Sequence, residues 1–244
     1  MSAPLFLVDA LPAGDTTTLD GPEGHHAADV QRVRRGERLV LADGQGGTAL
    51  AEVTGVAKGS VSLAIMNRTF RERPPVRVAV VQGIPKGDRG ELAVQAMTEV
   101  GVDEIVPWAA ARSIAQWRGD RGHKARAKWA ATAREAAKQA RRAYLPVVSG
   151  DPDVTTKQAA ARLSAATAAF VLHEDATTRL STAALPDEGE IVLVVGPEGG
   201  IADAELDVFL DAGATAVRLG DTVLRTSTAG VAAIAVLATR LGRW

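Results

Sequence analysis

Two glycine-rich turns near the C-terminal end of the chain carry the residue types best suited to hold a ligand. An apolar segment at 191–195 runs directly into Gly-Pro-Glu-Gly-Gly at 196–200, and a second segment runs into Leu-Gly-Asp-Thr-Val-Leu-Arg-Thr-Ser-Thr-Ala at 219–229. Each predicts a strand that ends in a turn opening a helix, and two such turns side by side form a crevice at the carboxyl edge of a parallel sheet. Glycine lets backbone N–H groups approach a ligand closely. No Lys follows the glycines, so the turns suit an adenine and ribose better than a triphosphate.

This pair of motifs resembles those of the SPOUT superfamily of RNA methyltransferases. Within it, the chain is similar to the RsmE-type small-subunit ribosomal RNA uridine-N3 methyltransferases over nearly its whole length. Either motif alone would fit an ordinary strand–helix connection, whereas both at this spacing and order are specific. The resemblance implies S-adenosylmethionine as cofactor, methylation of uracil N3 at one uridine of 16S rRNA, and a homodimer.

The composition is that of an ordinary globular protein and excludes several kinds of chemistry. The chain has 244 residues, is 46% hydrophobic and 23% charged, and contains no Cys. Disulfides, Cys–zinc sites and thiolate catalysis are therefore excluded, including methylation of pyrimidine C5 through a Cys nucleophile. The His residues at 25, 26, 123 and 173 lack a metal-ligand spacing, so no metal is expected.

The charges are strongly segregated although the net charge is only −1. Residues 112–142 hold ten Lys or Arg against two acids, Asp120 and Glu135. Such a basic stretch on a near-neutral protein indicates a polyanionic partner, although a solvated helix face is the simpler alternative. The resemblance implies that this partner is small-subunit rRNA or the 30S particle.

Residues 1–73 are predicted to form a small β-barrel domain. Strand patterns at 6–8, 38–42, 49–53 and 61–65 are separated by Gly-containing turn signals, with a brief helix at 25–34. In the resembled family this region is a PUA-like RNA-binding barrel. We expect Arg32 and Arg35 to face phosphate there; exposed solubilising arginines are the alternative.

Residues 74–244 are predicted to form an α/β domain with a parallel sheet, because strands alternate with helices after the linker at 71–75. Strands are expected at 76–82, 104–108, 168–172, 191–195 and 214–219. Helices are expected at 88–100, 123–143, 203–211 and 228–241. In the helix at 123–143, Trp129, Ala133, Ala136, Ala140 and Tyr144 share an apolar face. Residue patterns alone predict an open sheet; the C-terminal trefoil knot is implied by the resemblance.

Three loops are expected to form the cofactor site of the resembled family. The predicted cofactor-binding residues are Leu172, His173, Glu174, Val195, Gly196, Pro197, Glu198, Gly199, Gly200, Leu219, Gly220, Leu224, Thr226, Ser227 and Thr228. Glu174 is expected at the ribose hydroxyls or the substrate, with a surface carboxylate as the alternative.

Arg225 is the predicted catalytic residue. Its charge would favour the deprotonated uracil ring by stabilising negative charge on the carbonyl oxygens beside N3. It would otherwise grip the target phosphate or pair with Glu198. Ser227 stands where the family commonly has Glu, which removes a carboxylate able to act as a base, and it is expected to cap the final helix.

Further cations are expected to contact RNA. They are Lys86, Arg89, Arg141 and Arg142, and Arg141 stands where the family has Gly.

A cytoplasmic location is expected. The first ten residues lack a basic lead-in, and the longest apolar segment, 229–238, is too short to span a bilayer. Ribose 2′-O methylation, a non-catalytic RNA-binding or ribosome-assembly role and a nucleotide-binding metabolic enzyme remain alternatives.

Overall fold

The computed structural model describes residues 3–244, which divide into two compact units. The first unit extends to Arg73 and also includes Ala137–Leu145. The second consists of Pro74–Ala136 and Pro146–Trp244. The grouping of Ala137–Leu145 with the first unit was not anticipated from the sequence.

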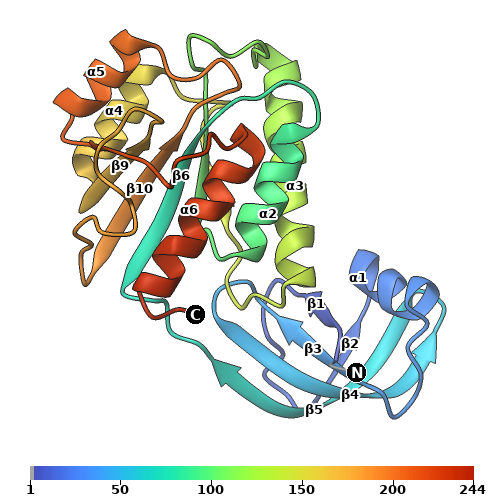
Figure 1. Cartoon of the computed structure of the whole chain (residues 1–244). Coiled ribbons are helices and arrows are strands. Elements are labelled where there is room, and N and C mark those ends of the chain that lie inside the picture. The colour runs from blue at the N-terminus through green and yellow to red at the C-terminus, as the bar shows by residue number, and fades with distance from the viewer. Residues whose placement is uncertain (1–2) are drawn as a thin grey trace. The chain divides into compact units, whose positions relative to one another are not determined.

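The first unit is built on a five-stranded sheet with the order β1-β3-β4-β5-β2 (Figure 1). Its elements are β1 (Leu5–Leu7), β2 (Thr16–Leu19), α1 (Gly21–His25), the π-helical turn η1 (His26–Val30), β3 (Arg38–Ala42), β4 (Gly47–Ala57) and β5 (Ser60–Phe70). All neighbouring strands are antiparallel except β1 and β3. Alternate residues of β4 are buried, as expected when one face of a sheet covers a core. The strand β2 was missed because its Thr-rich sequence has no apolar alternation.

The second unit is built on a six-stranded sheet with the order β11-β9-β10-β6-β7-β8, in which every pair is parallel. Its strands are β6 (Val76–Gly83), β7 (Glu104–Trp108), β8 (Val147–Val148), β9 (Ala168–Leu172), β10 (Gly189–Val195) and β11 (Thr215–Val217). Its helices are α2 (Arg89–Glu99), α3 (Gly119–Gln139), α4 (Thr156–Ala165), α5 (Asp203–Asp211) and α6 (Thr226–Arg240). This observation confirms the predicted α/β fold with a parallel sheet.

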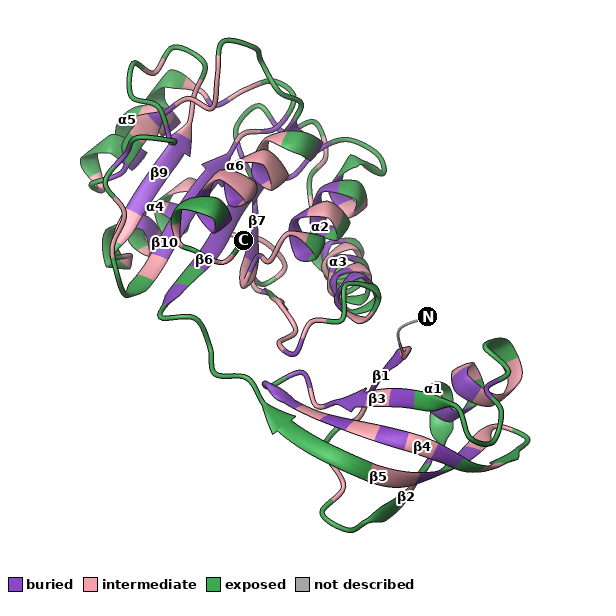
Figure 2. Cartoon of the chain, turned by 60° about the horizontal axis from the view of Figure 1, so that its bottom comes forward, coloured by how far each residue is buried: buried purple, intermediate pink, exposed green. Residues whose placement is uncertain are grey.

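Both faces of this sheet are covered by helices. Val78 and Val80 of β6 pack with α2, α3 and α6, whereas Ala79 and Val81 pack with α4 and α5. The two helical layers are visible in Figure 1, and Figure 2 shows β6, β9 and β10 largely buried. Because side chains alternate between faces, strands buried on both sides read as continuous apolar runs.

The helix α3 ends at Gln139, four residues before the predicted end at 143. Its last turn closes with bonds from Arg142 N to Ala137 O at 2.9 Å and from Arg141 N to Lys138 O at 3.0 Å. Arg141 has a φ of 54°, the left-handed conformation that this type of helix end requires. The apolar face therefore includes Trp129, Ala133 and Ala136, whereas Ala140 is exposed and Tyr144 lies outside the helix.

Two elements of the second unit, β8 and α4, were not predicted. The start of α4 carries a readable signal, since Thr155 accepts a bond from Gln158 N and Gln158 Oε1 accepts one from Thr155 N. The α6 helix begins at Thr226, two residues before the expected start.

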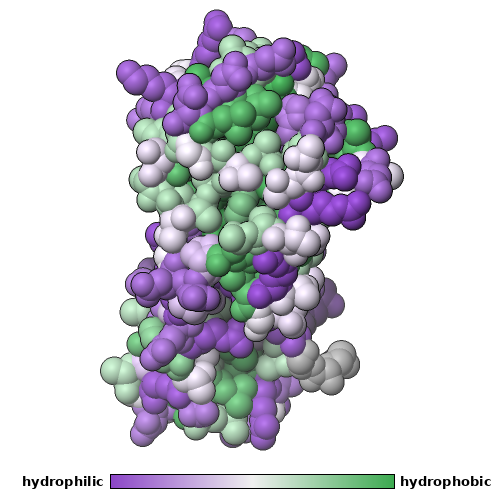
Figure 3. Space-filling view, turned by 60° about the vertical axis from the view of Figure 1, so that its left-hand side comes forward, coloured by the Kyte–Doolittle hydropathy of each residue, from purple (hydrophilic) through white to green (hydrophobic). Residues whose placement is uncertain are grey.

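The surface mixes apolar and polar side chains. Figure 3 shows apolar patches bordered by hydrophilic side chains on the face that it draws. Among residues 3–244, none of the helices has both the length and the apolarity that a membrane crossing requires.

The Gly90→Ala substitution is expected to destabilise the second unit. A Cβ at position 90 would lie 2.5 Å from Cζ2 of Trp129, whose ring packs edge-on against Trp117. Overpacking of this kind costs about 1–3 kcal/mol, which outweighs the gain of up to about 1 kcal/mol in helix propensity. Urea titration should show a lower free energy of unfolding.

Gly220→Ala is the matched control, because no heavy atom lies within 4 Å of a Cβ built there. Equal stability of the wild type and the Gly90→Ala variant would contradict the proposed packing of Trp129 on Gly90.

Candidate active site

A cavity of about 790 Å³ lies at the carboxyl ends of β9, β10 and β11. Three loops line it: 172–175 after β9, 196–201 after β10, and 218–225 before α6, together with Thr226 at the start of that helix. Parallel neighbours place these three ends at one edge of the sheet. Open α/β sheets bind their ligands at this edge.

Most of the predicted cofactor-binding residues line this cavity. They are Leu172, His173, Glu174, Val195, Gly196, Pro197, Glu198, Gly199, Gly200, Leu219, Gly220, Leu224 and Thr226. Ser227 and Thr228 do not line it. Ser227 is buried in the first turn of α6, and Thr228 is exposed and donates its hydroxyl to Arg225 O at 3.1 Å. The residue at the N-cap of α6 is Arg225, so the expectation that Ser227 caps this helix was wrong.

The carboxylate of Glu198 holds the turn after β10 against the start of α2. The Glu198 carboxylate accepts a bond from Lys86 N at 3.2 Å and pairs with Arg89 at 3.1 Å. Both partners lie where the chain enters α2. The ion pair that the sequence suggested between Arg225 and Glu198 is therefore replaced by one with Arg89.

A buried hydrogen-bond chain joins the turn after β10 to the start of α6. The Thr226 hydroxyl donates to Gly196 O at 2.7 Å and accepts from Gln82 Nε2 at 2.9 Å. Gln82 Nε2 also lies 3.0 Å from Gly83 O. Because Thr226 has only one proton and gives it to Gly196, the Gln82 amide must present its NH₂ group. The two glycine-rich turns are thereby connected through side chains, not only through the sheet.

Ion pairs of Asp221 restrain the loop before α6. The Asp221 carboxylate lies 3.4 Å from Arg218 and 3.6 Å from Arg179. On the strand side, His173 N donates to Val217 O at 3.0 Å. His173 thus serves as a loop residue that joins β9 to β11 through its backbone.

Arg225 lines the cavity with an exposed side chain. Its carbonyl accepts bonds from Thr228 N and Ala229 N, both at 2.9 Å, whereas its side chain takes no part in capping the helix. The backbone of Arg225 is thus fixed at the start of α6 while its guanidinium remains available to a bound substrate.

Sequence reasoning missed some lining residues that carry charge. Arg112 donates to Ile201 O at 3.2 Å and lies 3.9 Å from Asp203, so it borders the turn after β10 from a different loop. The only available signal was its place at the start of the basic stretch. Gln82 was also missed, although it is a buried polar residue that follows the apolar run 78–81 of β6.

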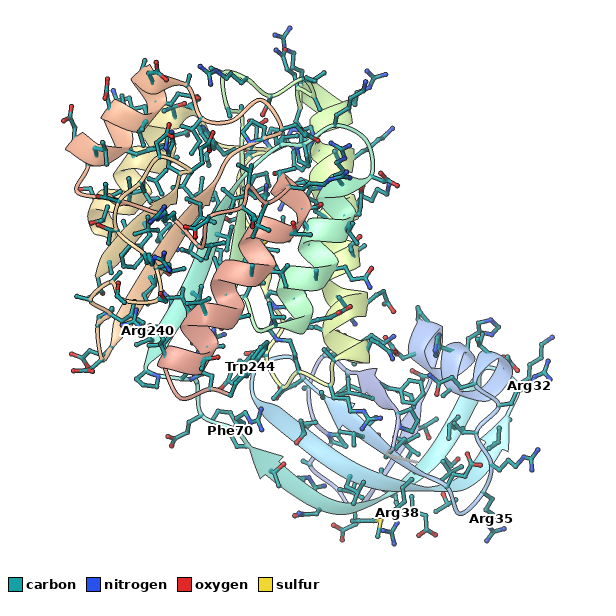
Figure 4. The ribbon with its side chains drawn as sticks, in the orientation of Figure 1. Arg32, Arg35, Arg38, Phe70, Arg240 and Trp244 are labelled. Atoms are coloured by element: carbon teal, nitrogen blue, oxygen red, sulfur yellow. The ribbon has the colours of Figure 1, made fainter. Side chains whose placement is uncertain are left out.

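The predicted RNA-contacting cations fall into different settings. Lys86 is exposed, Arg89 lines the cavity, and Arg141 and Arg142 follow α3. Figure 4 shows the side chains of Arg32 and Arg35 pointing away from the first unit. Arg32 has a φ of 54°, as Arg141 does.

In the basic stretch, hydrogen bonding and ion pairing with Glu91, 2.8 Å away, raise the pKa of Lys128. No group of three or more acidic or His side chains within residues 3–244 is arranged to hold a metal ion.

Comparison with known proteins identifies both parts of the chain. Residues 72–238 match the model of the RNA methyltransferase domain, and residues 19–66 match that of the RNA methyltransferase PUA domain. A protein of Mycobacterium tuberculosis, named ribosomal RNA small subunit methyltransferase E, is 45% identical and aligns with 100% of this chain and 94% of its own length. The Bacillus subtilis protein of the same name is 30% identical over 91% of this chain and 89% of its own.

Solved structures agree with these matches. The ribosomal RNA small subunit methyltransferase E of Neisseria gonorrhoeae, bound to S-adenosylmethionine, superposes with a TM-score of 0.85 at 29% identity and covers 98% of each chain. The resemblance inferred from the two glycine-rich turns is therefore confirmed. The chain belongs to the family of RNA methyltransferases and carries the PUA domain of such enzymes in its N-terminal part.

Proposed function

We propose that this protein transfers a methyl group from S-adenosylmethionine to N3 of one uridine in the 16S rRNA of the small ribosomal subunit. The observation that carries the proposal is that the two glycine-rich turns and the loop after β9 line one cavity together. Relatives of 45% and 30% identity are named as small-subunit rRNA methyltransferases.

The cavity residues fit S-adenosylmethionine, which supplies an activated methyl group when bound. Leu172 and Leu219 offer apolar surface for an adenine ring, and Gly200 leaves room beside the backbone, since the nearest atom to a Cβ built there lies 3.8 Å away. The Glu174 carboxylate is exposed on the cavity wall, where it can accept bonds from ribose hydroxyls. A volume of about 790 Å³ lies within the usual range of small-molecule sites.

Arg225 is the proposed catalytic residue. Uracil N3 carries a proton that must leave before or during methyl transfer, and the negative charge then spreads onto the neighbouring carbonyl oxygens. A guanidinium at the cavity wall stabilises this charge, and it stays protonated throughout. The backbone bonds that fix Arg225 at the start of α6 limit the positions that its side chain can sample.

The finer features of the fold and assembly are also proposals. We propose that the sheet of the first unit closes as a PUA-like barrel and that α6 passes through the preceding loop as a trefoil knot. The hydrogen bond between Thr226 and Gly196 supports the knot, because it holds the start of α6 against the turn after β10.

A homodimer is supported by exposed apolar side chains at the cavity, such as Val223, which is 78% exposed. An rRNA substrate favours a cytoplasmic location.

The domain division at 73/74 is a proposal as well, with the segment Ala137–Leu145 added to the first domain. The cations at Arg32, Arg35, Lys86, Arg89, Arg141 and Arg142 are proposed to contact RNA phosphates. All of them except the half-buried Arg142 are exposed, and Arg89 lies in the cavity wall, which supports this assignment.

Arg225→Ala is expected to lower the rate of methyl transfer by about 10²–10³-fold, the usual effect of removing a group that stabilises developing charge. The measurement is transfer of label from S-adenosylmethionine to small ribosomal subunits that lack the modification. Arg77→Ala is the matched control, because Arg77 is an exposed cation in β6, away from the cavity. Full activity of the Arg225→Ala variant would refute its catalytic role.

Thr226→Val is expected to weaken the binding of S-adenosylmethionine at least tenfold, because it removes the bonds to Gly196 and Gln82 and leaves buried polar groups unpaired. Thr226→Ser keeps the hydroxyl and should restore most of the affinity. Isothermal titration calorimetry measures both. No cofactor binding by the wild type would instead favour a non-catalytic role.

The modified nucleoside should be 3-methyluridine. Mass spectrometry of nuclease digests of the methylated rRNA distinguishes it from a ribose-methylated nucleoside, which also leaves an alkali-resistant linkage. The latter product would show that the enzyme methylates the 2′-hydroxyl.

A further inference from the structure

A second hollow, of about 530 Å³, lies entirely within the first unit. It is formed where β1, β3, β4 and β5 meet the segment after α3. Its lining residues are Leu5, Val40, Thr48, Thr69, Phe70, Arg71, Arg141 and Ala143. None of these residues belongs to the candidate active site.

The hollow combines an exposed aromatic ring with apolar walls. Phe70, at the end of β5, is 68% exposed (Figure 4), and Figure 2 shows this end of the strand as exposed. Leu5 and Ala143 supply buried apolar surface beside it. An aromatic side chain held open in this way offers its face to a flat ligand, and every nucleobase has such a face.

The charge of the hollow is positive. Arg71 and Arg141 line it, and none of its lining residues is acidic. Two hydrogen bonds fix the backbone of Arg71. Its carbonyl accepts one from the Tyr144 hydroxyl at 2.7 Å, and its N–H donates one to Gly46 O at 2.9 Å. Two guanidinium groups beside an apolar recess suit a ligand that carries both a ring and phosphates.

Arg141 occupies a position that glycine would fill at lower cost. Its φ of 54° lies in the left-handed region, which a residue with a Cβ adopts only with strain. Residues in this conformation cluster at binding and active sites, and here the end of α3 requires the conformation. The guanidinium of Arg141, at the rim of the hollow, is a group that suits an anionic ligand.

We propose that this hollow binds one unstacked nucleotide of the RNA substrate. The base stacks on Phe70, and the adjoining phosphates contact Arg71 and Arg141. The proposal rests on the proposed function in one respect, namely that the substrate is RNA. The proposal places a specific nucleotide-binding site in the PUA domain, apart from the methyl-transfer cavity.

The experiment uses the full-length protein and a single-stranded oligoribonucleotide, about ten residues long, that contains 2-aminopurine. Stacking on Phe70 is expected to quench the fluorescence of the probe. Phe70→Leu keeps apolar volume but removes the aromatic face, so it should raise the Kd for the probe about fivefold or more and remove the quenching. Phe70→Trp should restore both.

Met66→Leu is the matched control, because Met66 is a half-exposed apolar residue of the same strand that does not line the hollow. Its binding should equal that of the wild type. Equal binding and quenching by the wild type and Phe70→Leu would overturn the proposal. A change in oligomeric state on Phe70→Leu, measured by sedimentation, would also overturn it, because a second copy of the chain would then cover this ring.

Arg141→Gly separates binding from stability. It should weaken binding and reduce the slope of log Kobs against log[salt] by about 0.7, the value for one phosphate contact on a single strand. Its thermal stability should stay close to that of the wild type, because the left-handed conformation that glycine favours offsets the loss of the contacts of the arginine side chain. An unchanged salt slope would remove Arg141 from the site.

Calorimetry with S-adenosylmethionine and a methylation assay distinguish a failure of the proposed function from a failure of the nucleotide site. All these variants should bind the cofactor as the wild type does. If the wild type fails to methylate RNA, the proposed function fails; if it methylates RNA and Phe70→Leu binds and methylates equally well, only the nucleotide site fails.

Discussion

The candidate active site depends on one buried hydroxyl. Thr226 donates to Gly196 O and accepts from Gln82, so a single side chain joins the turn after β10, the end of β6 and the start of α6. A hydrogen bond of this kind contributes about 1 kcal/mol, but leaving its partners unpaired and buried costs about 1–3 kcal/mol for each group. The turns that face the cavity are therefore held together more firmly than backbone packing alone would achieve.

The parallel sheet makes this arrangement possible. Strands buried on both faces bring the carboxyl ends of β9, β10 and β11 to one edge, and the covering helices leave that edge free for loops. Glu198 then anchors the turn after β10 to Lys86 and Arg89 at the entrance to α2. The rigid core and the ligand-facing loops are thus connected by a few polar contacts whose geometry the sheet determines.

Positive charge is used differently in the two units. In the second unit, Arg89 and Arg112 are engaged with the turn after β10, whereas Arg225 has a fixed backbone and an exposed side chain. In the first unit, Arg32 and Arg141 both adopt left-handed backbone conformations at the ends of helical segments. An RNA-modifying enzyme needs cations both to shape its site and to hold a polyanion, and these arginines are consistent with that division.

The order of strands and helices in the second unit, the two glycine-rich turns and most cavity-lining residues could be predicted from the sequence, because apolar runs and glycine spacing are local properties. The family could also be recognised from the turns at 196–200 and 219–229, since their residues are specific in combination. The role of Gln82, the place of Arg112 at the cavity and the burial of Ser227 were decided only by the tertiary structure. Each depends on which distant segment lies beside it. The end of α3 and the hollow beside Phe70 were decided in the same way, because a left-handed arginine and an exposed ring follow from packing that no local pattern records.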